Sequence, residues 1–389
     1  MINFEFLSPT KILFGRDMEK QAGPMVKKYA NKALLHYGSG SIRKNGLYNT
    51  VTQSLREAGV EYVELSGVQP NPRVSLVREG IELCRREKVD FILAVGGGSV
   101  IDSAKAIGVG VPYDGDVWDF YDKSAEPKET LPVGTVLTIA AAGSEVSPSS
   151  VITNEDGHFK RGLDIDLIRP VFSILNPALT CSLPPFQTAC GAADIMCHTM
   201  ERYFTNVPDV DFSDRLCEAG LQAVIKALPK ALKDPADYAA RAEIMWAGSV
   251  VHNDLFSAGR IGDWASHGIE HEVSGIYDIT HGAGLSIGYP AWMKYVYQHN
   301  IPRFAQFASR VWGVDYDFYH PELTALEGIS RLESFWKSCG LPTRFSEVGI
   351  GDDRFEEMAA KATKNDTVTL GNLMKLGKQD IINIYTLAK

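Results

Sequence analysis

The second half of the chain carries carboxylate and imidazole side chains at spacings that suit a metal ion. Asp194 and His198 are four residues apart, so on a helix they lie on one face, one turn apart. His267 and His271 repeat this spacing, and His281 follows ten residues later. Carboxylate oxygen and imidazole nitrogen are ligands for Zn²⁺ or Fe²⁺, with a position left for substrate. The pattern predicts a divalent metal site, but spacing leaves open which of the three later histidines bind the ion.

The same region allows a second interpretation. His267-Gly268-Ile269-Glu270-His271 matches the H-x-x-E-H pattern of inverted zinc peptidases. In that alternative Glu270 would be the general base, and the Asp194–His198 pair would be incidental. A pattern with three fixed positions arises easily by chance, and it leaves the glycine segments described next unexplained. We therefore keep the peptidase as an alternative hypothesis.

A glycine turn between a strand and a helix is the sharpest local feature of the first half. Phe91–Val95 is an apolar run, Gly96-Gly97-Gly98-Ser99 follows it, and a helix begins immediately. Glycines allow close approach of a ligand and positive φ angles, and a helix start offers unpaired N–H groups to an anion. The pattern is not G-x-G-x-x-G, because Ile101 occupies the last glycine position. The turn predicts a phosphate site, and a tight turn without a ligand is the alternative.

A second glycine segment, Gly38-Ser39-Gly40-Ser41, follows another predicted strand and leads into Arg43 and Lys44. An NAD site would place an acidic residue near here for the ribose 2′-hydroxyl. This segment has hydroxyl groups and two cations instead, which favours the 2′-phosphate of NADP. A solvated loop with a basic helix start is the alternative.

Strand and helix signals alternate through the first half of the chain. Such an order predicts a doubly wound α/β domain with a buried parallel sheet. The helix Val74–Lys88 has amphipathic spacing, and Asn3–Phe14 is expected to form an opening hairpin. Its edge strand would be covered by a second subunit, so a homodimer is expected. The predicted strands are Ala33–Tyr37, Glu61–Leu65, Phe91–Val95, Val133–Ile139 and Val171–Leu175.

Helical periodicity replaces this alternation after Pro184-Pro185. We therefore divide the chain into residues 1–178, a Rossmann-like α/β dinucleotide-binding domain, and residues 179–389, an all-α metal-binding domain. The predicted helices of the second domain include Gln187–Tyr203, Ser213–Leu232, Ala239–Asn253 and Pro302–Val311.

Composition narrows the class of protein without naming a reaction. The chain of 389 residues has 39 Lys and Arg against 48 Asp and Glu, a net charge of −9, which argues against a nucleic-acid partner. The start lacks the features of a signal peptide, and no apolar stretch reaches the length of a membrane span. The six cysteines form no C-x-x-C pair. A cytoplasmic protein without a membrane partner is expected.

Together these motifs resemble those of the iron-containing alcohol dehydrogenases. The resemblance extends over almost the whole chain, with features of the NADP-dependent butanol dehydrogenase and broad aldehyde reductase branch. It implies a dehydroquinate synthase-like pairing of a Rossmann-like domain with a helical domain. The motifs are Pro9–Gly15, Gln69–Pro72, Gly96–Ser99 with Asp102 and Lys105, Ala142–Glu145, Trp264–His267, and the series Asp194, His198, His267, His271 and His281.

The resemblance also implies roles for individual residues. One divalent metal, Fe²⁺ or Zn²⁺, is expected on Asp194, His198, His267 and His281, with His271 beside the nicotinamide as a proton-relay candidate. The expected cofactor NADP(H) would contact Gly97, Gly98, Ser99, Asp102 and Thr138, with Gly38, Ser39, Gly40, Ser41 and Lys44 at its 2′-phosphate end. The implied reaction interconverts primary alcohols and short to medium aliphatic aldehydes, mainly in the direction of aldehyde reduction.

One position departs from the family pattern. The family commonly has threonine where this chain has Ala142, so one cofactor hydrogen bond is lost, at a typical cost of about 0.5–1.5 kcal/mol. Trp246, Phe256 and Trp264 are aromatic candidates for the substrate pocket, with a helical core as the alternative. A nucleotide-binding protein without catalysis, in which the histidines hold a structural metal, is a third hypothesis.

Overall fold

The computed structural model describes residues 1–389, which form two compact units. The sheet unit consists of Leu7–Leu183 and Ala236–Asn253. The helical unit consists of Met1–Phe6, Pro184–Pro235 and Asp254–Lys389. The division into residues 1–178 and 179–389 stays a prediction. The contacts divide the chain differently at residues 1–6, 179–183 and 236–253.

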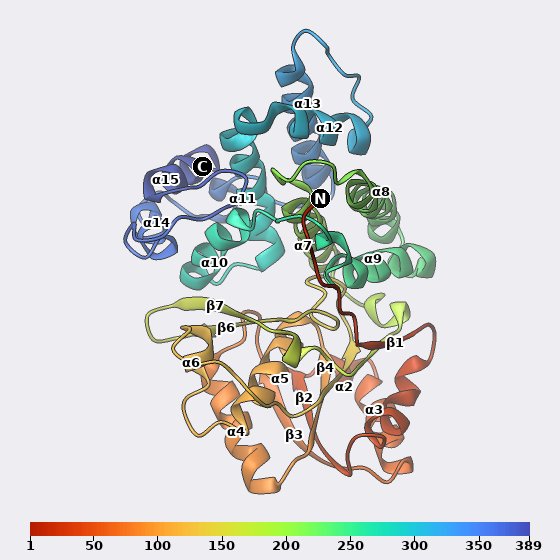
Figure 1. Cartoon of the computed structure of the whole chain (residues 1–389). Helices are drawn as coiled ribbons and strands as arrows, with labels where there is room; N and C mark the ends of the chain where they lie inside the picture. Colours follow the sequence, from red (N-terminus) through yellow and green to blue (C-terminus); the bar gives the residue numbers. More distant parts are fainter. The chain divides into compact units, whose positions relative to one another are not determined.

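Six parallel strands form the main sheet of the sheet unit, in the order β1-β8-β5-β4-β2-β3 (Figure 1). All five predicted strands are confirmed within a few residues of their expected ends. Their continuous apolar runs are explained by burial on both faces of a parallel sheet. The strands are β1 (Lys11–Phe14), β2 (Lys32–Gly38), β3 (Glu61–Val68), β4 (Phe91–Gly96), β5 (Val133–Leu137) and β8 (Phe172–Leu175).

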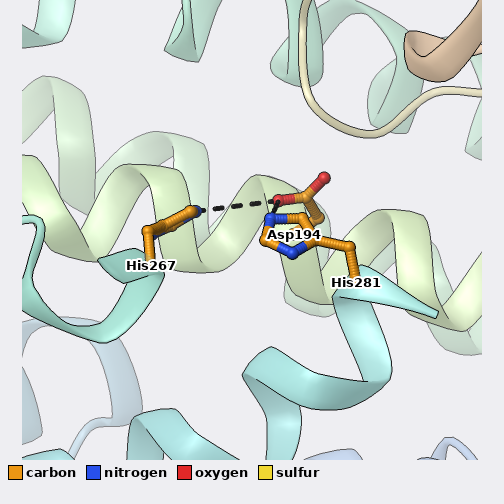
Figure 2. A group of neighbouring side chains, drawn as sticks. All are labelled: Asp194, His267 and His281. Atoms are coloured by element: carbon orange, nitrogen blue, oxygen red, sulfur yellow. Dashed lines mark ion pairs between the residues drawn. The ribbon is translucent and has the colours of Figure 1, made fainter. Parts of the chain in front are cut away.

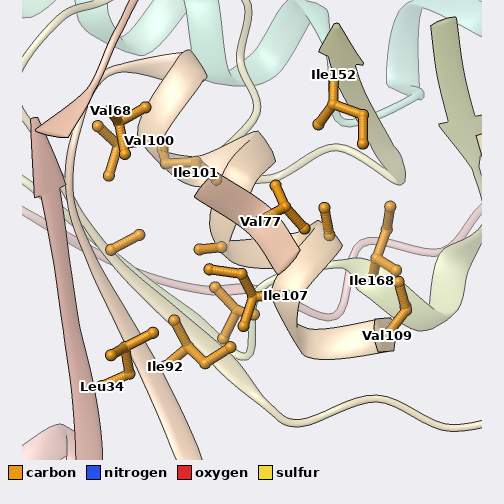
Figure 3. Packing of buried hydrophobic residues seen from close by; sticks show 14 of the residues in the cluster. Leu34, Val68, Val77, Ile92, Val100, Ile101, Ile107, Val109, Ile152 and Ile168 are labelled. Atoms are coloured by element: carbon orange, nitrogen blue, oxygen red, sulfur yellow. The ribbon is translucent and has the colours of Figure 1, made fainter. Parts of the chain in front are cut away.

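Helices cover both faces of this sheet. On one face α4 and α5 pack over Leu34 and Ile92, and Ile152 of a small hairpin joins the same core (Figure 3). On the other face α1 and α3 pack over Leu35 and Phe172. The helical segments of the unit are η1 (Met18–Gln21), α1 (Ala22–Val26), α2 (Ser41–Lys44), α3 (Leu47–Glu57), α4 (Val74–Glu87), α5 (Gly98–Gly110), α6 (Trp118–Tyr121), η2 (Asp166–Ile168), η3 (Pro177–Thr180) and α9 (Tyr238–Val251).

The opening hairpin predicted over Asn3–Phe14 is wrong. Only β1 is a strand, and it lies at the sheet edge, parallel to β8. Pro9 explains the difference, because proline donates no ladder hydrogen bond and interrupts a strand. Thr10 Oγ1 instead donates to the carbonyl of Pro170 at 2.7 Å, which fixes the chain just before β1.

An antiparallel hairpin was not predicted. It consists of β6 (Ser149–Asn154) and β7 (Phe159–Asp164). The Asp156-Gly157 dipeptide between them is a strong turn signal, and Gly157 takes a positive φ of 81°. The hairpin packs on α5, so α5 is enclosed between the sheet and the hairpin.

Helix α9 was predicted correctly as a helix, but it packs with the sheet unit. Ser249 Oγ on α9 donates to Glu145 Oε1 at 2.5 Å. The guanidinium of Arg16 lies 3.8 Å from the ring centroid of Tyr238, at the start of the helix. These contacts are polar and specific, which periodicity along one segment does not reveal.

The helical unit consists of helices packed on helices, as predicted. No helix of the structure combines the length and the apolar character that a membrane span requires. Its segments are α7 (Pro185–Tyr203), α8 (Asp211–Lys233), η4 (Leu255–Ser257), α10 (Ala265–Tyr277), α11 (His281–Val296), η5 (Tyr297–Asn300), α12 (Ile301–Trp312), α13 (Pro321–Ser338), η6 (Phe345–Val348), α14 (Phe355–Ala362) and α15 (Lys378–Leu387).

Helices α7 and α11 meet at a glycine. A Cβ atom built on Gly282 would lie 2.1 Å from the backbone oxygen of Cys190. No real Cβ fits at that distance, so only glycine lets the start of α11 approach α7 so closely. The contact brings His281, the first residue of α11, toward Asp194 in the middle of α7.

A buried histidine lies at the centre of the parallel sheet. His36 is fully buried on β2. Its Nδ1 donates to the carbonyl of Leu65 at 3.0 Å, so Nε2 accepts from Ser103 Oγ at 2.9 Å. Burial lowers the pKa of His36 to about 4, and the hydrogen bond to Leu65 opposes this only in part. His36 is therefore neutral in the folded protein at neutral pH.

This lowered pKa predicts a pH-dependent stability. The unfolded histidine titrates near 6.5, so below that pH the unfolded chain binds more protons than the folded one. Stability should fall as the pH drops from about 6.5 toward 4, by about 3 kcal/mol in total. His36→Asn keeps a donor for Leu65 but does not titrate, so its melting temperature should fall less over this range. The exposed His299→Asn is the control, and an equal pH dependence of all three proteins would contradict the assignment.

Gly282→Ala should force α11 away from α7 and destabilise the protein by about 1–3 kcal/mol, the usual effect of overpacking. Gly288→Ala is the matched control, because it lies on the same helix and an added Cβ there meets nothing within 4 Å. Alanine should also improve helix propensity at that position. Thermal unfolding measures both variants, and a melting temperature of Gly282→Ala equal to that of Gly288→Ala would rule out the close approach.

Candidate functional site

Three helices of the helical unit bring together a carboxylate and two imidazoles (Figure 2). Asp194 lies in the middle of α7, His267 in the first turn of α10, and His281 at the first position of α11. The candidate ligand atoms of these three residues all lie within 4.8 Å of one another. The sequence left open which of three histidines join Asp194, and the packing brings His267 and His281 to it.

The nitrogen atoms of the cluster converge on one oxygen. From Asp194 Oδ1, the distance is 3.6 Å to His198 Nε2, 3.9 Å to His267 Nε2 and 3.8 Å to His281 Nε2. These distances are longer than hydrogen bonds. Asp194 Oδ1 and His267 Nε2 are buried and have no hydrogen-bond partner. Buried polar atoms are rarely left without one, and this donor set is one that Zn²⁺ or Fe²⁺ accepts, so the residues fit a divalent ion.

The electrostatics of the cluster favour positive charge. Burial lowers the pKa of His267, but Asp194 and Glu201 outweigh it and raise the pKa to about 9. The two carboxylates therefore favour a cation at this position, either a proton or a metal ion.

His198 and His271 lie beside the three-residue group. The His198 ring stacks on His267 with a centroid distance of 4.6 Å, in addition to its ion pair with Asp194. The His271 ring lies 5.8 Å from His281 and forms a second possible group with Glu270 and His281. The four-ligand set with His198, and the proton-relay role of His271, both stay predictions.

Two buried glutamates accept hydrogen bonds from Nδ1 of His267 and His281, the ring nitrogens opposite those nearest Asp194. Glu201 Oε1 accepts from His267 Nδ1 at 2.8 Å, and Glu270 Oε2 accepts from His281 Nδ1. Our sequence analysis missed Glu201, although its position seven residues after Asp194 places both on one face of α7. Glu270 is 1% exposed and also accepts from Ser274 Oγ, which leaves little support for the general-base role that the peptidase alternative requires.

The glycine turn of the sheet unit connects β4 to α5. A Cβ on Gly96 would lie 2.4 Å from the Val100 side chain, and one on Gly97 would lie 3.1 Å from Ile139. None of the glycines at positions 96–98 takes the positive φ that glycine allows. Glycine is needed because the chain packs against itself here, and Gly98 and Ser99 start the helix half-buried.

Thr138 and Ala142, which the sequence analysis connected with cofactor binding, lie beside this glycine turn. The Thr138 N–H donates to the Gly96 carbonyl at 3.0 Å, and the Cβ of Ala142 lies 3.5 Å from a Cβ built on Gly98. Ala142, the position where the family commonly has threonine, therefore lies at the glycine turn itself.

The Asp102 carboxylate is bound by its own chain. It accepts from Ser144 Oγ at 2.5 Å and from the Val151 N–H at 3.0 Å. Burial raises the pKa of Asp102, and the neighbouring Lys105 opposes the rise. Lys105 is also fully buried and donates to Ser144 Oγ at 3.0 Å. These contacts tie α5 to the segment that follows β5, and a direct contact of Asp102 with a cofactor stays a prediction.

The second glycine segment follows β2. Gly40 takes a φ of 122°, which favours glycine, and Ser39, Ser41 and Lys44 are exposed. Arg43, however, does not stand alone as the sequence suggested. Its guanidinium donates to Glu64 Oε2 on β3 at 2.7 Å.

Two tyrosines complete this Arg43–Glu64 pair. Tyr48 donates to Glu64 Oε1 at 2.6 Å, Tyr37 donates to Glu64 Oε2 at 2.7 Å, and the Arg43 guanidinium lies 3.8 Å from the Tyr48 ring centroid. One of the two cations expected for a 2′-phosphate is therefore paired with a carboxylate that sequence reasoning did not connect to it.

The three aromatic pocket candidates lie in different places. The Trp264 ring lies 5.4 Å from the His267 ring and 5.9 Å from the His198 ring, beside the metal-site candidates. Trp246 lies on α9 of the sheet unit, against Phe14. Phe256 is buried in η4.

Comparisons with known proteins agree with this geometry. Among curated proteins, the chain is 45% identical to the probable NADH-dependent butanol dehydrogenase 2 of Bacillus subtilis, over 99% of both chains. It is 33% identical to the NADPH-dependent aldehyde reductase YqhD of Escherichia coli, over 95% of both. The crystal structure of NADH-dependent butanol dehydrogenase A from Thermotoga maritima superposes with a TM-score of 0.96 at 39% identity, covering 100% of this chain and 99% of that one.

Two family models cover most of the chain. The model of iron-containing alcohol dehydrogenases matches residues 9–177, and the model of the C-terminal region of the Fe-containing alcohol dehydrogenase family matches residues 188–388. With a Rossmann-like parallel sheet, a helical unit and the Asp194 cluster in place, the chain belongs to the iron-containing alcohol dehydrogenase family.

Proposed function

We propose that this protein is a butanol dehydrogenase-like oxidoreductase that interconverts primary aliphatic alcohols and aldehydes with a nicotinamide cofactor and one divalent metal. The observation that carries the proposal is the convergence of buried Asp194 and His267 atoms with the half-buried His281 in a chain of this family. The relatives named butanol dehydrogenase and aldehyde reductase support the substrate class.

In this proposal Asp194, His198, His267 and His281 hold Fe²⁺ or Zn²⁺. The bound ion would supply Lewis-acid polarisation of the substrate oxygen, and the nicotinamide would supply or accept the hydride. His271, one turn after His267 and half-buried, gains or loses the proton at a ring nitrogen. Trp264 forms part of the wall on which the substrate chain rests.

The backbone of Gly97, Gly98 and Ser99 binds the cofactor phosphates at the start of α5. Asp102 and Thr138 hold the surrounding segments in position. Gly38–Ser41 and Lys44 contact the adenosine end. We retain the homodimer as part of the proposal, because β1 is an edge strand with no neighbour on its outer side.

The choice between NADH and NADPH depends, in our proposal, on Arg43 and Glu64. The sequence favoured NADP(H) because the segment has cations and no acid. The ion pair weakens that argument, since Glu64 neutralises Arg43 and would repel a 2′-phosphate. The relatives with 40–45% identity are named NADH-dependent, and YqhD is named NADPH-dependent. We therefore propose NADH as the preferred cofactor.

The wild-type protein should oxidise NADH with butanal, lose this activity to a chelator and regain it with Fe²⁺ or Zn²⁺. His267→Ala should lose bound metal and reduce turnover by about 100-fold or more, since metal ligands act on the transition state. Nicotinamide fluorescence should show unchanged cofactor binding. His320→Ala, at an exposed histidine, is the control.

Other outcomes would contradict this function. Undiminished turnover in His267→Ala would exclude the metal assignment. Cofactor-independent peptide hydrolysis that Glu270→Gln abolishes would establish the peptidase alternative. Cofactor binding without turnover on any aldehyde would leave the non-catalytic nucleotide-binding protein.

Glu64→Gln should shift binding toward NADPH, because the amide removes the charge that neutralises Arg43 and repels a phosphate. A shift of about 3- to 10-fold in the ratio of the NADPH and NADH dissociation constants is expected for a partly exposed charge. Titration of cofactor fluorescence without substrate measures it. Glu61→Gln, exposed on the same strand, controls for the change in net charge. A wild-type protein that already prefers NADPH would refute our assignment of Arg43 and Glu64.

A further inference from the structure

The Glu201 carboxylate on α7 accepts an unusually large set of hydrogen bonds. Its side chain is completely buried. Oε1 accepts from His267 Nδ1 at 2.8 Å, from the His267 N–H at 3.2 Å and from Ser266 Oγ. Oε2 accepts from the Trp264 N–H at 2.6 Å. One carboxylate thus binds four donors from the start of α10.

These contacts determine which nitrogen of His267 carries a proton. A carboxylate can only accept, so Nδ1 holds the hydrogen, and in the neutral ring Nε2 is the nitrogen that presents a lone pair. Nε2 is the atom that faces Asp194 and has no hydrogen-bond partner. A metal ion needs the histidine in this tautomer and orientation, and a negative acceptor on Nδ1 makes Nε2 a better ligand.

The same carboxylate also holds Trp264. The backbone of Trp264 has a φ of 64°, a left-handed conformation that a bulky residue rarely adopts. Its N–H points to Glu201 in this conformation, and its ring lies against those of His198 and His267. Glu201 therefore compensates the strain of a turn that places an aromatic ring beside the metal-site candidates.

His281 has a similar arrangement with Glu270. A Cβ on Gly284 would lie 2.5 Å from Glu270 Oε1, so glycine on α11 makes room for this carboxylate. Glu270 also accepts from Ser274 Oγ on its own helix.

We propose that Glu201 is a positioning residue for the metal site, which sets the tautomer of His267 and fixes the Trp264 turn beside it. The inference rests on the proposed metal-dependent function. It assigns to Glu201 a part in metal affinity that a purely structural buried glutamate would not have.

The test compares Glu201→Gln with Glu218→Gln. Glu218 is a buried glutamate of the same unit that accepts from Tyr203 and Arg215 and touches no metal-site residue. In Glu201→Gln, whichever way the amide turns, the charge opposite His267 is lost and at least one of the four donors faces an NH₂ group. Zn²⁺ affinity, measured against a chromogenic chelator, should weaken about 10- to 100-fold in Glu201→Gln and remain unchanged in Glu218→Gln. The visible spectrum of bound Co²⁺ should shift only in Glu201→Gln.

The outcomes separate this inference from the proposed function, because no assay here depends on turnover. A wild-type protein that binds none of Zn²⁺, Co²⁺ and Fe²⁺ would overturn both. Zn²⁺ binding by the wild type with equal affinity in Glu201→Gln would overturn only the role of Glu201. If Glu201→Gln does not fold, Glu201→Asp keeps the charge but shortens the side chain, and the same comparison applies. Unchanged affinity and an unchanged Co²⁺ spectrum in that variant would also refute the role.

Discussion

The helical unit is organised around one carboxylate oxygen, Asp194 Oδ1. A buried carboxylate is stable only when a cation or hydrogen bonds compensate its charge. Here the nearest groups are imidazole nitrogens at 3.6–3.9 Å, too far for hydrogen bonds. The close contact at Gly282 and the buried Glu201 and Glu270 all keep these groups in place. In the proposed metal site, a bound cation would interact with this oxygen without a rearrangement of the helices.

Much of the fold could be predicted from the sequence, because the spacing of apolar residues shows which faces of the strands and helices are buried. Those faces determine how the sheet and the helices pack on one another. The five predicted strands and the long helices illustrate this. The errors have local causes. Asn3–Phe14 alternates like a hairpin, but Pro9 interrupts it, and the β6–β7 hairpin was overlooked despite its Asp156-Gly157 turn. The packing of α9 on the sheet unit includes contacts with Glu145, Arg16 and Phe14, which are remote in sequence from the helix.

The residues of the candidate site could be predicted from the sequence where they lie on a single helix. Asp194 and His198 share a face of α7, and Glu201 could have been found by extending that face. The choice among His267, His271 and His281 was different, because it depends on how α10 and the start of α11 pack against α7. The pair of Arg43 and Glu64 joins a short helix to a neighbouring strand, and only the register of β2 with β3 brings them together.

The enclosure of α5 has a consequence for how a nucleotide is bound. The helix packs against the sheet on one side and against α4 and the β6–β7 hairpin on the others, so its position is fixed by the core of the unit. In the proposed cofactor site, phosphate groups bound at this helix start would lose little affinity to ordering of the protein, because the N–H groups are held in place by the fold. The short helix α2 at the other glycine segment is more exposed, with Ile42 as its buried residue and Arg43 held by polar contacts. Adaptation to a different adenosine substituent is therefore concentrated in α2, while the phosphate end can remain unaltered.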